Sequence, residues 1–309
     1  MGAFGRATGR SDRGPEGLAV FEGVFTALVT PFRDDAIDED SLRDLVEWQI
    51  DAGVDGLAPC GSTGESATLS HEEHRRVVEI VVSAVRGRVP VVAGTGSNST
   101  REAIELTRHA KEAGADAALL ISPYYNKPTQ EGIVAHYAAI ARATEFPLIV
   151  YNIPGRTASN ILPSTIARLA DVEHVVGVKE ACGDLAQVAT VVALCPDEFS
   201  VLSGDDALTL PTLAVGGRGV ISTTANLVPG EMSALVRAGR AGEREEALRI
   251  HQRLLPLFDV VFCETNPIPL KTALVLLGRI RDEIRLPLTP LTPPNRERLQ
   301  VVLKELGLI

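Results

Sequence analysis

The sequence predicts a (β/α)8 TIM barrel with a C-terminal helical appendage, and two observations carry this prediction. Between residues 24 and 226, eight short β-branched apolar segments alternate with longer segments of helical period. Strands that are apolar throughout and are joined by helices indicate a parallel sheet covered on both faces. Eight such units over about 220 residues indicate that the sheet closes into a barrel.

The predicted elements follow one another along the chain with short connections. The strands are expected at residues 24–32, 55–61, 89–96, 116–125, 146–154, 174–180, 199–205 and 218–226. Segments between them, such as SLRDLVEWQIDAG (41–53) and STREAIELTRHAKEAG (99–114), place apolar residues at helical spacing. We therefore expect a barrel domain over residues 21–240 and a C-terminal helical extension over residues 241–309.

Residues 1–20, MGAFGRATGRSDRGPEGLAV, differ in composition from the rest of the chain. They are rich in Gly and Arg and lack hydrophobic periodicity, which predicts a disordered tail. A short organellar presequence is the rival interpretation, but Asp12 and Glu16 disfavour it.

Composition excludes several classes of protein. The net charge of -10 argues against a general binder of nucleic acid or of anionic membranes. No run of about 18 apolar residues predicts a membrane span. The four cysteines are scattered, with no CxxC pair and no secretory signal. This pattern favours a reducing cytoplasm and predicts neither disulfides nor a zinc site.

The segment HVVGVKEACGD (174–184) sets a lysine, Lys179, directly after a β-branched apolar run. In (β/α)8 barrels the C-terminal ends of the strands point into the active site, and Lys179 lies at such an end. One interpretation is an ammonium group that pairs with a carboxylate such as Glu180 or extends to water. The other is a partly desolvated amine, whose lowered pKa lets its neutral form attack a carbonyl and make a Schiff base.

Polar groups at neighbouring strand ends favour the Schiff-base interpretation. The segment GSTGES (61–66) follows the second strand, and its amides and hydroxyls can converge on a carboxylate, although the same residues also suit a helix start. Three of the four tyrosines, Tyr124, Tyr125 and Tyr151, fall near the ends of the fourth and fifth strands, at the predicted mouth of the barrel. A phenol with a pKa near 10 is a suitable proton donor to a carbinolamine or alkoxide.

Two further motifs predict no site. The segment GTGSNS (94–99) resembles the start of a dinucleotide fingerprint, but Ser99 replaces the third glycine. His71 and His74 share a helix face, yet no third metal ligand lies at a suitable spacing. We therefore expect neither a nicotinamide cofactor nor a metal ion.

Seven motifs lie in order along the chain. They are GSTGES (61–66), PYYNKPTQEG (123–132), YNIPGRT (151–157), GVKEACGD (177–184), LSGDD (202–206), GVISTTAN (219–226) and ETNPIPLK (264–271). They resemble the 4-hydroxy-tetrahydrodipicolinate (dihydrodipicolinate) synthase branch of the pyruvate-dependent class I aldolase family, which includes N-acetylneuraminate lyase. The resemblance runs from about residue 22 to the C-terminus. It implies condensation of pyruvate with L-aspartate 4-semialdehyde in lysine and diaminopimelate biosynthesis, without a cofactor.

The resemblance implies catalytic roles for four residues. Lys179 matches the lysine that condenses with pyruvate, and Tyr151 matches the tyrosine that moves protons. Ser62 and Tyr125 match the hydroxyl and the second tyrosine of a proton relay. In the family the neighbouring subunit supplies that second tyrosine, and the family implies a homotetramer built from tight dimers. Many synthases have threonine in place of Ser62, and serine lacks the methyl group that restrains χ1.

Four further residues match substrate-binding positions of the family. Thr63 matches the clamp on the pyruvate carboxylate, and Arg156 matches the cation that receives the carboxylate of the semialdehyde. The main chain at Gly204 and Ile221 is implied to line the pocket.

The resemblance also implies a regulatory site for L-lysine. In synthases inhibited by lysine, the amino acid binds in a cleft at the tight dimer interface. The matching positions here hold residue types that can bind an amino acid, namely Ser66, Ala67, His71, His74, Asn98, Glu102 and Tyr124. The alternative for the two histidines is the solvated first turn of a helix, with Ser70 as its N-cap.

Two other functions stay open at this point. A sister aldolase, such as a sialic-acid or 2-keto-3-deoxy-sugar-acid lyase, would cleave its substrate to pyruvate. Arg156 favours the synthase, because those lyases generally lack an arginine there. A barrel that binds a keto acid as a sensor or assembly subunit, without turnover, is the second alternative.

Overall fold

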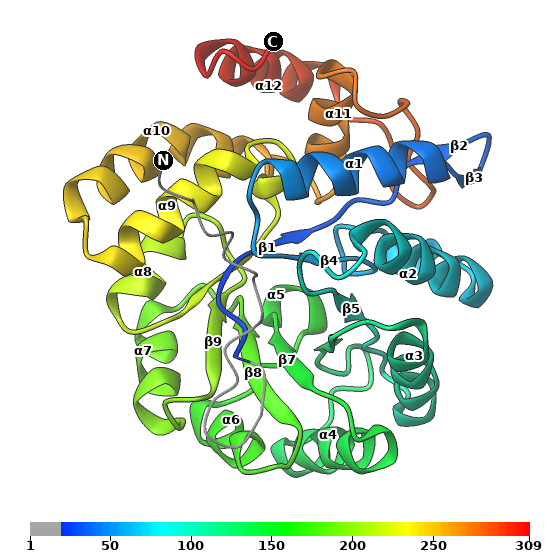
Figure 1. Cartoon of the computed structure of the whole chain (residues 1–309), viewed down its shortest axis with the longest axis vertical. Coiled ribbons are helices and arrows are strands. Elements are labelled where there is room, and N and C mark those ends of the chain that lie inside the picture. Colours follow the sequence, from blue (N-terminus) through cyan, green and yellow to red (C-terminus); the bar gives the residue numbers. More distant parts are fainter. Residues whose placement is uncertain (1–19) are drawn as a thin grey trace, which may run out of the picture.

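Eight parallel strands form the centre of the molecule, and helices surround them (Figure 1). The computed structural model describes residues 20–309. The barrel strands are β1 (Gly23–Ala27), β4 (Gly56–Ala58), β5 (Val92–Gly94), β6 (Ala117–Ile121), β7 (Leu148–Asn152), β8 (Val175–Glu180), β9 (Ser200–Ser203) and β10 (Gly219–Ser222). They pair in the order β4-β1-β10-β9-β8-β7-β6-β5, and a parallel bridge between Leu57 and Val91 joins the two edges. The predicted (β/α)8 barrel is therefore confirmed.

One main helix follows each barrel strand. These helices are α1 (Glu39–Asp51), α2 (His71–Val85), α3 (Thr100–Ala113), α4 (Gln130–Thr144), α6 (Pro163–Ala170), α7 (Leu185–Leu194), α8 (Thr209–Ala214) and α9 (Pro229–Ala241). Short helical turns lie near the strand ends: α5 (Pro154–Thr157) and the 3-10 helices η1 (Ser66–Thr68) and η2 (Thr224–Asn226). Ser70 caps α2 as predicted, and its hydroxyl and the Glu73 side chain form a capping box.

The prediction of a first strand over residues 24–32 is wrong in its second half. β1 ends at Ala27, and β2 (Phe32–Arg33) pairs with β3 (Ala36–Ile37) in a small antiparallel hairpin. Asp34 and Asp35 between them have φ values of 54° and 61°. Two successive left-handed residues make the tight turn that reverses the chain.

Three helices follow the barrel: α10 (Arg244–Val260), α11 (Ile268–Leu276) and α12 (Pro293–Glu305). Figure 1 shows α11 and α12 at the top of the view, outside the ring of barrel helices. The division at residue 240 stays a prediction. The predicted disordered tail lies, except for Val20, outside the described residues. No helix between residues 20 and 309 combines the length and the apolar character needed to cross a membrane, and the cytoplasmic location stays a prediction.

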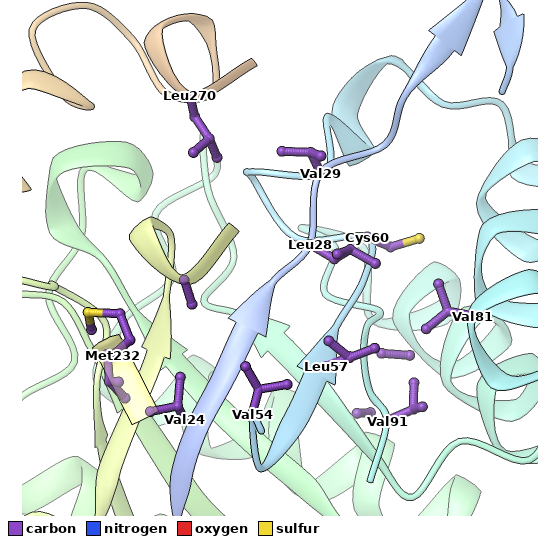
Figure 2. Close-up of a cluster of buried hydrophobic side chains, with 14 of the residues drawn as sticks. Val24, Leu28, Val29, Val54, Leu57, Cys60, Val81, Val91, Met232 and Leu270 are labelled. Atoms are coloured by element: carbon purple, nitrogen blue, oxygen red, sulfur yellow. The ribbon is translucent and has the colours of Figure 1, made fainter. Parts of the chain in front are cut away.

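Two buried clusters lie on the two sides of the sheet. The larger cluster packs the strands against the helices; Figure 2 shows part of it, including Val24, Leu57, Val81 and Met232. The smaller cluster fills the barrel interior with residues of alternate strand positions, among them Phe25, Leu119, Ile149, Tyr151, Val176, Leu202 and Ile221. Tyr151 thus belongs to the interior of the barrel.

A β-bulge in β8 decides which side of the sheet carries Lys179. β7 and β8 pair Leu148 with Val175 but Ile149 with Gly177, so that Val176 is an extra residue. Val175 packs in the outer cluster, whereas Val176 packs in the interior one. Because side chains alternate along a strand, this extra residue turns Lys179 to the interior, in register with Tyr151.

Candidate active site

Lys179 is buried at the C-terminal end of β8, with 5% of its surface exposed. Its Nζ lies 4.3 Å from the centroid of the Tyr151 ring on the neighbouring strand. Gly204, after β9, approaches the lysine from the other side, since a Cβ there would lie 3.0 Å from Lys179 Cε. Within residues 20–309, Lys179 Nζ takes part in no ion pair and no protein hydrogen bond.

Glu180 does not pair with Lys179. Its Oε1 accepts hydrogen bonds from Asn152 Nδ2 at 2.9 Å and from the Cys182 amide at 3.0 Å. Gln187 Nε2 lies 3.3 Å from its other carboxylate oxygen. Adjacent residues of a strand face opposite sides, so Glu180 points toward the helices. The interpretation of Lys179 as an ammonium group paired with Glu180 or extended to water is therefore wrong.

The protonation states of Lys179 and Tyr151 suit Schiff-base chemistry. Burial lowers the pKa of Lys179 to about 8; the Asp206 carboxylate opposes this shift, and Arg156 adds to it. A pKa of that size leaves about a tenth of the amine neutral at pH 7. Burial raises the pKa of Tyr151 to about 12, against the opposing effects of Arg156 and of a hydrogen bond with Ser62. Tyr151 is thus a protonated donor beside a partly neutral amine.

Asn266 connects two of the four predicted substrate-binding residues, Thr63 and Arg156. Its Nδ2 donates to Thr63 Oγ1 at 2.9 Å, and its carbonyl accepts from Arg156 Nη2 at 3.0 Å. Thr63 is buried, whereas Arg156 is exposed at the rim. Sequence reasoning assigned Asn266 no role, because the contacts join residues far apart in the chain. Its position in ETNPIPLK, outside the barrel strands, was the only signal.

Asp206 is a second residue that sequence reasoning missed. Its buried carboxylate accepts hydrogen bonds from the Thr223 amide at 3.1 Å, the Thr224 amide at 2.8 Å and the Thr224 hydroxyl at 2.8 Å. Ser222 Oγ also donates to it. Burial raises the pKa of this carboxyl, and these donors oppose the shift. Asp206 therefore holds the end of β10, while its charge acts on Lys179.

One cavity of about 450 Å³ is lined by part of the predicted catalytic site and by most of the predicted regulatory residues, whereas Lys179 and Thr63 are not among its lining residues. Its lining includes Ser62, Tyr151, Arg156 and Asn266 at the catalytic end, and Ser66, Ala67, His71, His74, Glu102 and Tyr124 from the predicted lysine cleft. Ile221, by contrast, is buried in the interior cluster that also contains Tyr151. The Asn98 carbonyl accepts a hydrogen bond from Asn126 Nδ2 at 2.9 Å.

The cleft end of this cavity carries an ionised carboxylate. His71 Nε2 lies 2.8 Å from Glu102 Oε1, and Ser97 Oγ donates to the other carboxylate oxygen. The Ser97 hydrogen bond, followed by His71, lowers the pKa of Glu102. His74 is 6% exposed, and its Nε2 lies 2.7 Å from the Gly94 carbonyl. The alternative of a solvated histidine pair is therefore wrong for His74.

Tyr125 does not join the other tyrosines. It is 89% exposed, has a φ of 69°, and is absent from the cavity lining within the described chain. The three tyrosines near these strand ends therefore do not all face one space within a single chain, because the consecutive residues Tyr124 and Tyr125 point in different directions. Among residues 20–309, no cluster of three or more His, Cys, Asp or Glu side chains is arranged for a metal.

Known proteins are similar to this sequence along almost the whole chain. Residues 20–306 match the Dihydrodipicolinate synthetase family. The chain belongs to that family. A curated member from Syntrophus aciditrophicus (strain SB), named 4-hydroxy-tetrahydrodipicolinate synthase, is 56% identical over 290 residues, which are 94% of this chain and 100% of the relative.

Solved structures of the dihydrodipicolinate synthetase family have the same fold. The enzyme from Acinetobacter baumannii, described as chloride inhibited and complexed with pyruvate, is 46% identical, with a TM-score of 0.92 over 93% of this chain and 99% of its own. The enzyme from Cyanidioschyzon merolae, described with lysine bound, is 42% identical, with a TM-score of 0.91 over 94% and 99% of the two chains. The resemblance inferred from the seven motifs is confirmed.

The lowered pKa of Lys179 predicts a pH profile for adduct formation. Only the neutral amine attacks a carbonyl, so the initial rate of borohydride trapping with pyruvate should rise about tenfold per pH unit below pH 8 and level off above it. Arg156→Ala removes a charge that lowers this pKa and should move the rise to higher pH. A rate that stays flat between pH 6 and pH 9 in the unaltered protein would contradict the assignment.

Proposed function

We propose that the chain condenses pyruvate with L-aspartate 4-semialdehyde to give 4-hydroxy-tetrahydrodipicolinate, in lysine and diaminopimelate biosynthesis. The buried, unpaired Lys179 amine beside Tyr151 is the observation that carries the proposal. The name of the Syntrophus relative, 56% identical over 94% of this chain, supports the same reaction. The chemistry requires no cofactor, because the lysine itself forms the electron-withdrawing imine.

The reaction begins with attack of the neutral Lys179 amine on the keto carbon of pyruvate. The resulting carbinolamine takes a proton on its hydroxyl and loses water, which leaves a Schiff base. The Tyr151 phenol, with its pKa raised to about 12, is protonated and can donate that proton, and Ser62 can relay it. Thr63 holds the pyruvate carboxylate, with the main chain at Gly204 and Ile221 lining the pocket.

Carbon–carbon bond formation follows from the Schiff base. Loss of a methyl proton gives an enamine, whose carbon attacks the aldehyde of the semialdehyde while the aldehyde oxygen takes up a proton. Arg156, exposed at the rim, receives the carboxylate of this second substrate. The substrate's own amine then attacks the imine carbon and displaces Lys179, which closes the ring. One water molecule is released for each pair of substrates.

A second copy of the chain is part of this proposal. Tyr125 is 89% exposed and lies outside the cavity of its own chain, which suits a residue that serves a neighbouring subunit. We infer a tight dimer in which each subunit completes the relay of the other, and a homotetramer built from two such dimers. The measurement is the oligomeric state in solution, together with the activity of Tyr125→Phe.

The two alternatives have less support. The sugar-acid lyases bind a polyol in place of a second carboxylate, whereas Arg156 offers a cation at the rim. A sensor without turnover does not need an amine with a pKa near 8. A panel of aldehydes offered to the pyruvate adduct separates the synthase from the lyases.

Lys179→Ala should abolish the pyruvate adduct, because the reacting nitrogen is gone. Lys179→Arg should fail as well, since a guanidinium stays protonated and cannot become an imine. Borohydride trapping followed by mass spectrometry measures the adduct. Lys304→Ala, at an exposed position of α12, is the control and should react like the unaltered chain. Trapping that persists in Lys179→Ala would remove this lysine from the mechanism.

Arg156→Ala should impair use of the semialdehyde far more than the pyruvate adduct. A charge-assisted contact contributes on the order of 1.5–3 kcal/mol, and exposure of Arg156 places the loss near the lower limit, about tenfold in kcat/KM. Steady-state kinetics with each substrate varied gives the comparison. Equal losses for both substrates would show that Arg156 acts only by holding Asn266 across the rim.

L-lysine should inhibit the enzyme partially by binding the Glu102 end of the cavity. Glu102→Ala or His71→Ala should weaken inhibition about tenfold while the pyruvate adduct still forms, because the ionised carboxylate receives an ammonium group. Glu105→Ala, at an exposed position of the same helix, is the matched control. Full activity in several millimolar lysine, with no heat of binding by calorimetry, would leave the cleft without a regulatory role.

A further inference from the structure

Glu65 combines two unfavourable features in the loop that carries Ser62 and Thr63. Its backbone is left-handed, with a φ of 54°, and its side chain is buried, with 4% of the residue exposed. A left-handed glutamate is uncommon, and a buried carboxylate is unfavourable unless it is paired. The surrounding structure must therefore hold this residue in place.

Residues of the C-terminal extension hold Glu65 in place. Lys271 of α11 is 3% exposed, and its Nζ lies 2.6 Å from Glu65 Oε1. The same Nζ donates to the Thr30 carbonyl at 3.0 Å and lies 4.4 Å from the centroid of the Phe32 ring. The Arg285 amide donates to the other oxygen of Glu65 at 3.2 Å. Both carboxylate oxygens are thus held by residues beyond the barrel.

The Glu65 backbone passes this hold to the catalytic loop. Its amide donates to the Ser62 carbonyl at 3.2 Å, and the Gly64 carbonyl accepts from the Thr30 hydroxyl at 2.7 Å. Thr30 therefore contacts the loop through its side-chain hydroxyl, and its main-chain carbonyl accepts the hydrogen bond from Lys271. A shift of Glu65 must move Ser62 and the intervening Thr63, because the turn between them is short.

Arg285 secures the far side of the same loop. Its Nη1 donates to the Thr68 carbonyl at 3.1 Å and to Glu73 Oε2 at 2.8 Å. The guanidinium also lies 4.2 Å from the Phe32 ring, which the ammonium of Lys271 contacts as well. The loop is thus held at Glu65 and again at Thr68, with Ser66 and Ala67 between the two points.

We propose that Glu65 and Lys271 are a positioning pair. Their buried ion pair fixes the loop so that Thr63 and Ser62 lie at the correct positions to contact pyruvate. This inference rests on the proposed function, which makes Thr63 the clamp on the pyruvate carboxylate. Neither Glu65 nor Lys271 is assigned contact with the substrate. The pair thereby gives the C-terminal extension a role in catalysis.

The test compares the double variant Glu65→Gln/Lys271→Met with its two single variants. Each single variant leaves one buried group without its partner and should lower the thermal midpoint, whereas the double variant removes both charges at similar side-chain volume and should recover much of that loss. With the loop no longer fixed, the KM for pyruvate in the double variant should rise about tenfold, because small displacements of a binding group weaken positioning. The fall in kcat should be smaller.

Two further readouts separate positioning from simple instability. Trapping of Lys179 at saturating pyruvate should remain complete in the double variant, and its pH profile should keep the same midpoint, because the surroundings of Lys179 are unaltered. The matched control is Glu131→Gln/Arg168→Met, an ion pair at 2.6 Å between α4 and α6, away from the loop. The control should leave the pyruvate KM unchanged.

A double variant with a recovered thermal midpoint and a pyruvate KM within twofold of the unaltered chain would assign the pair to stability alone. Should the double variant fail to fold, Glu65→Asp carries the test, since it keeps the charge but shortens the reach to Lys271. Its KM for pyruvate should rise about threefold or more on the same reasoning, and an unchanged value would overturn the proposal. An unaltered chain that traps no pyruvate would overturn the proposed function and this inference together.

Discussion

Burying the Lys179 amine in the barrel interior removes it from water without giving it a carboxylate partner. Desolvation then penalises the ammonium form, and the pKa falls to about 8. The groups that surround the amine keep it away from water and without a carboxylate partner. Tyr151 covers it with an aromatic ring, and Gly204 lets the main chain approach where a Cβ would lie 2.7 Å from Ala181 Cβ and 3.0 Å from Lys179 Cε. The nucleophilic character of Lys179 therefore follows from the burial of its amine. A carboxylate paired with that amine would stabilise the ammonium form and reduce the neutral fraction.

The fold provides this environment through the alternation of side chains along β8. Without the bulge at Val176, residues 175, 177 and 179 would share one face, and Lys179 would point toward the helices with Val175. The extra residue instead sends Lys179 inward and Glu180 outward, where Asn152 and Gln187 bind the carboxylate. The bulge therefore separates a lysine and a glutamate that are neighbours in sequence, which keeps the amine unpaired.

The sequence predicts the elements of this fold better than the contacts between them. Apolar strand runs and helical spacing were sufficient for eight βα units, and the position of Lys179 after such a run pointed to the active-site end of the barrel. The hairpin after β1 escaped prediction because a buried loop and a strand are equally apolar. The roles of Asn266 and Asp206 depend on partners that no periodicity connects, and the exposed direction of Tyr125 depends on one left-handed residue.

Lys179 and Lys271 show that burial of a lysine side chain has two different outcomes in this chain. Both are nearly fully buried, and both follow apolar residues, in GVK and PIPLK respectively. Burial lowers the pKa of each, but only Lys271 has a carboxylate at 2.6 Å, and Glu65 opposes the shift there. The paired lysine is held in a fixed place and can hold the loop in return. The unpaired one is left free to react. A lysine inside an apolar run therefore indicates a function in both cases. The presence or absence of a carboxylate partner determines which function it is.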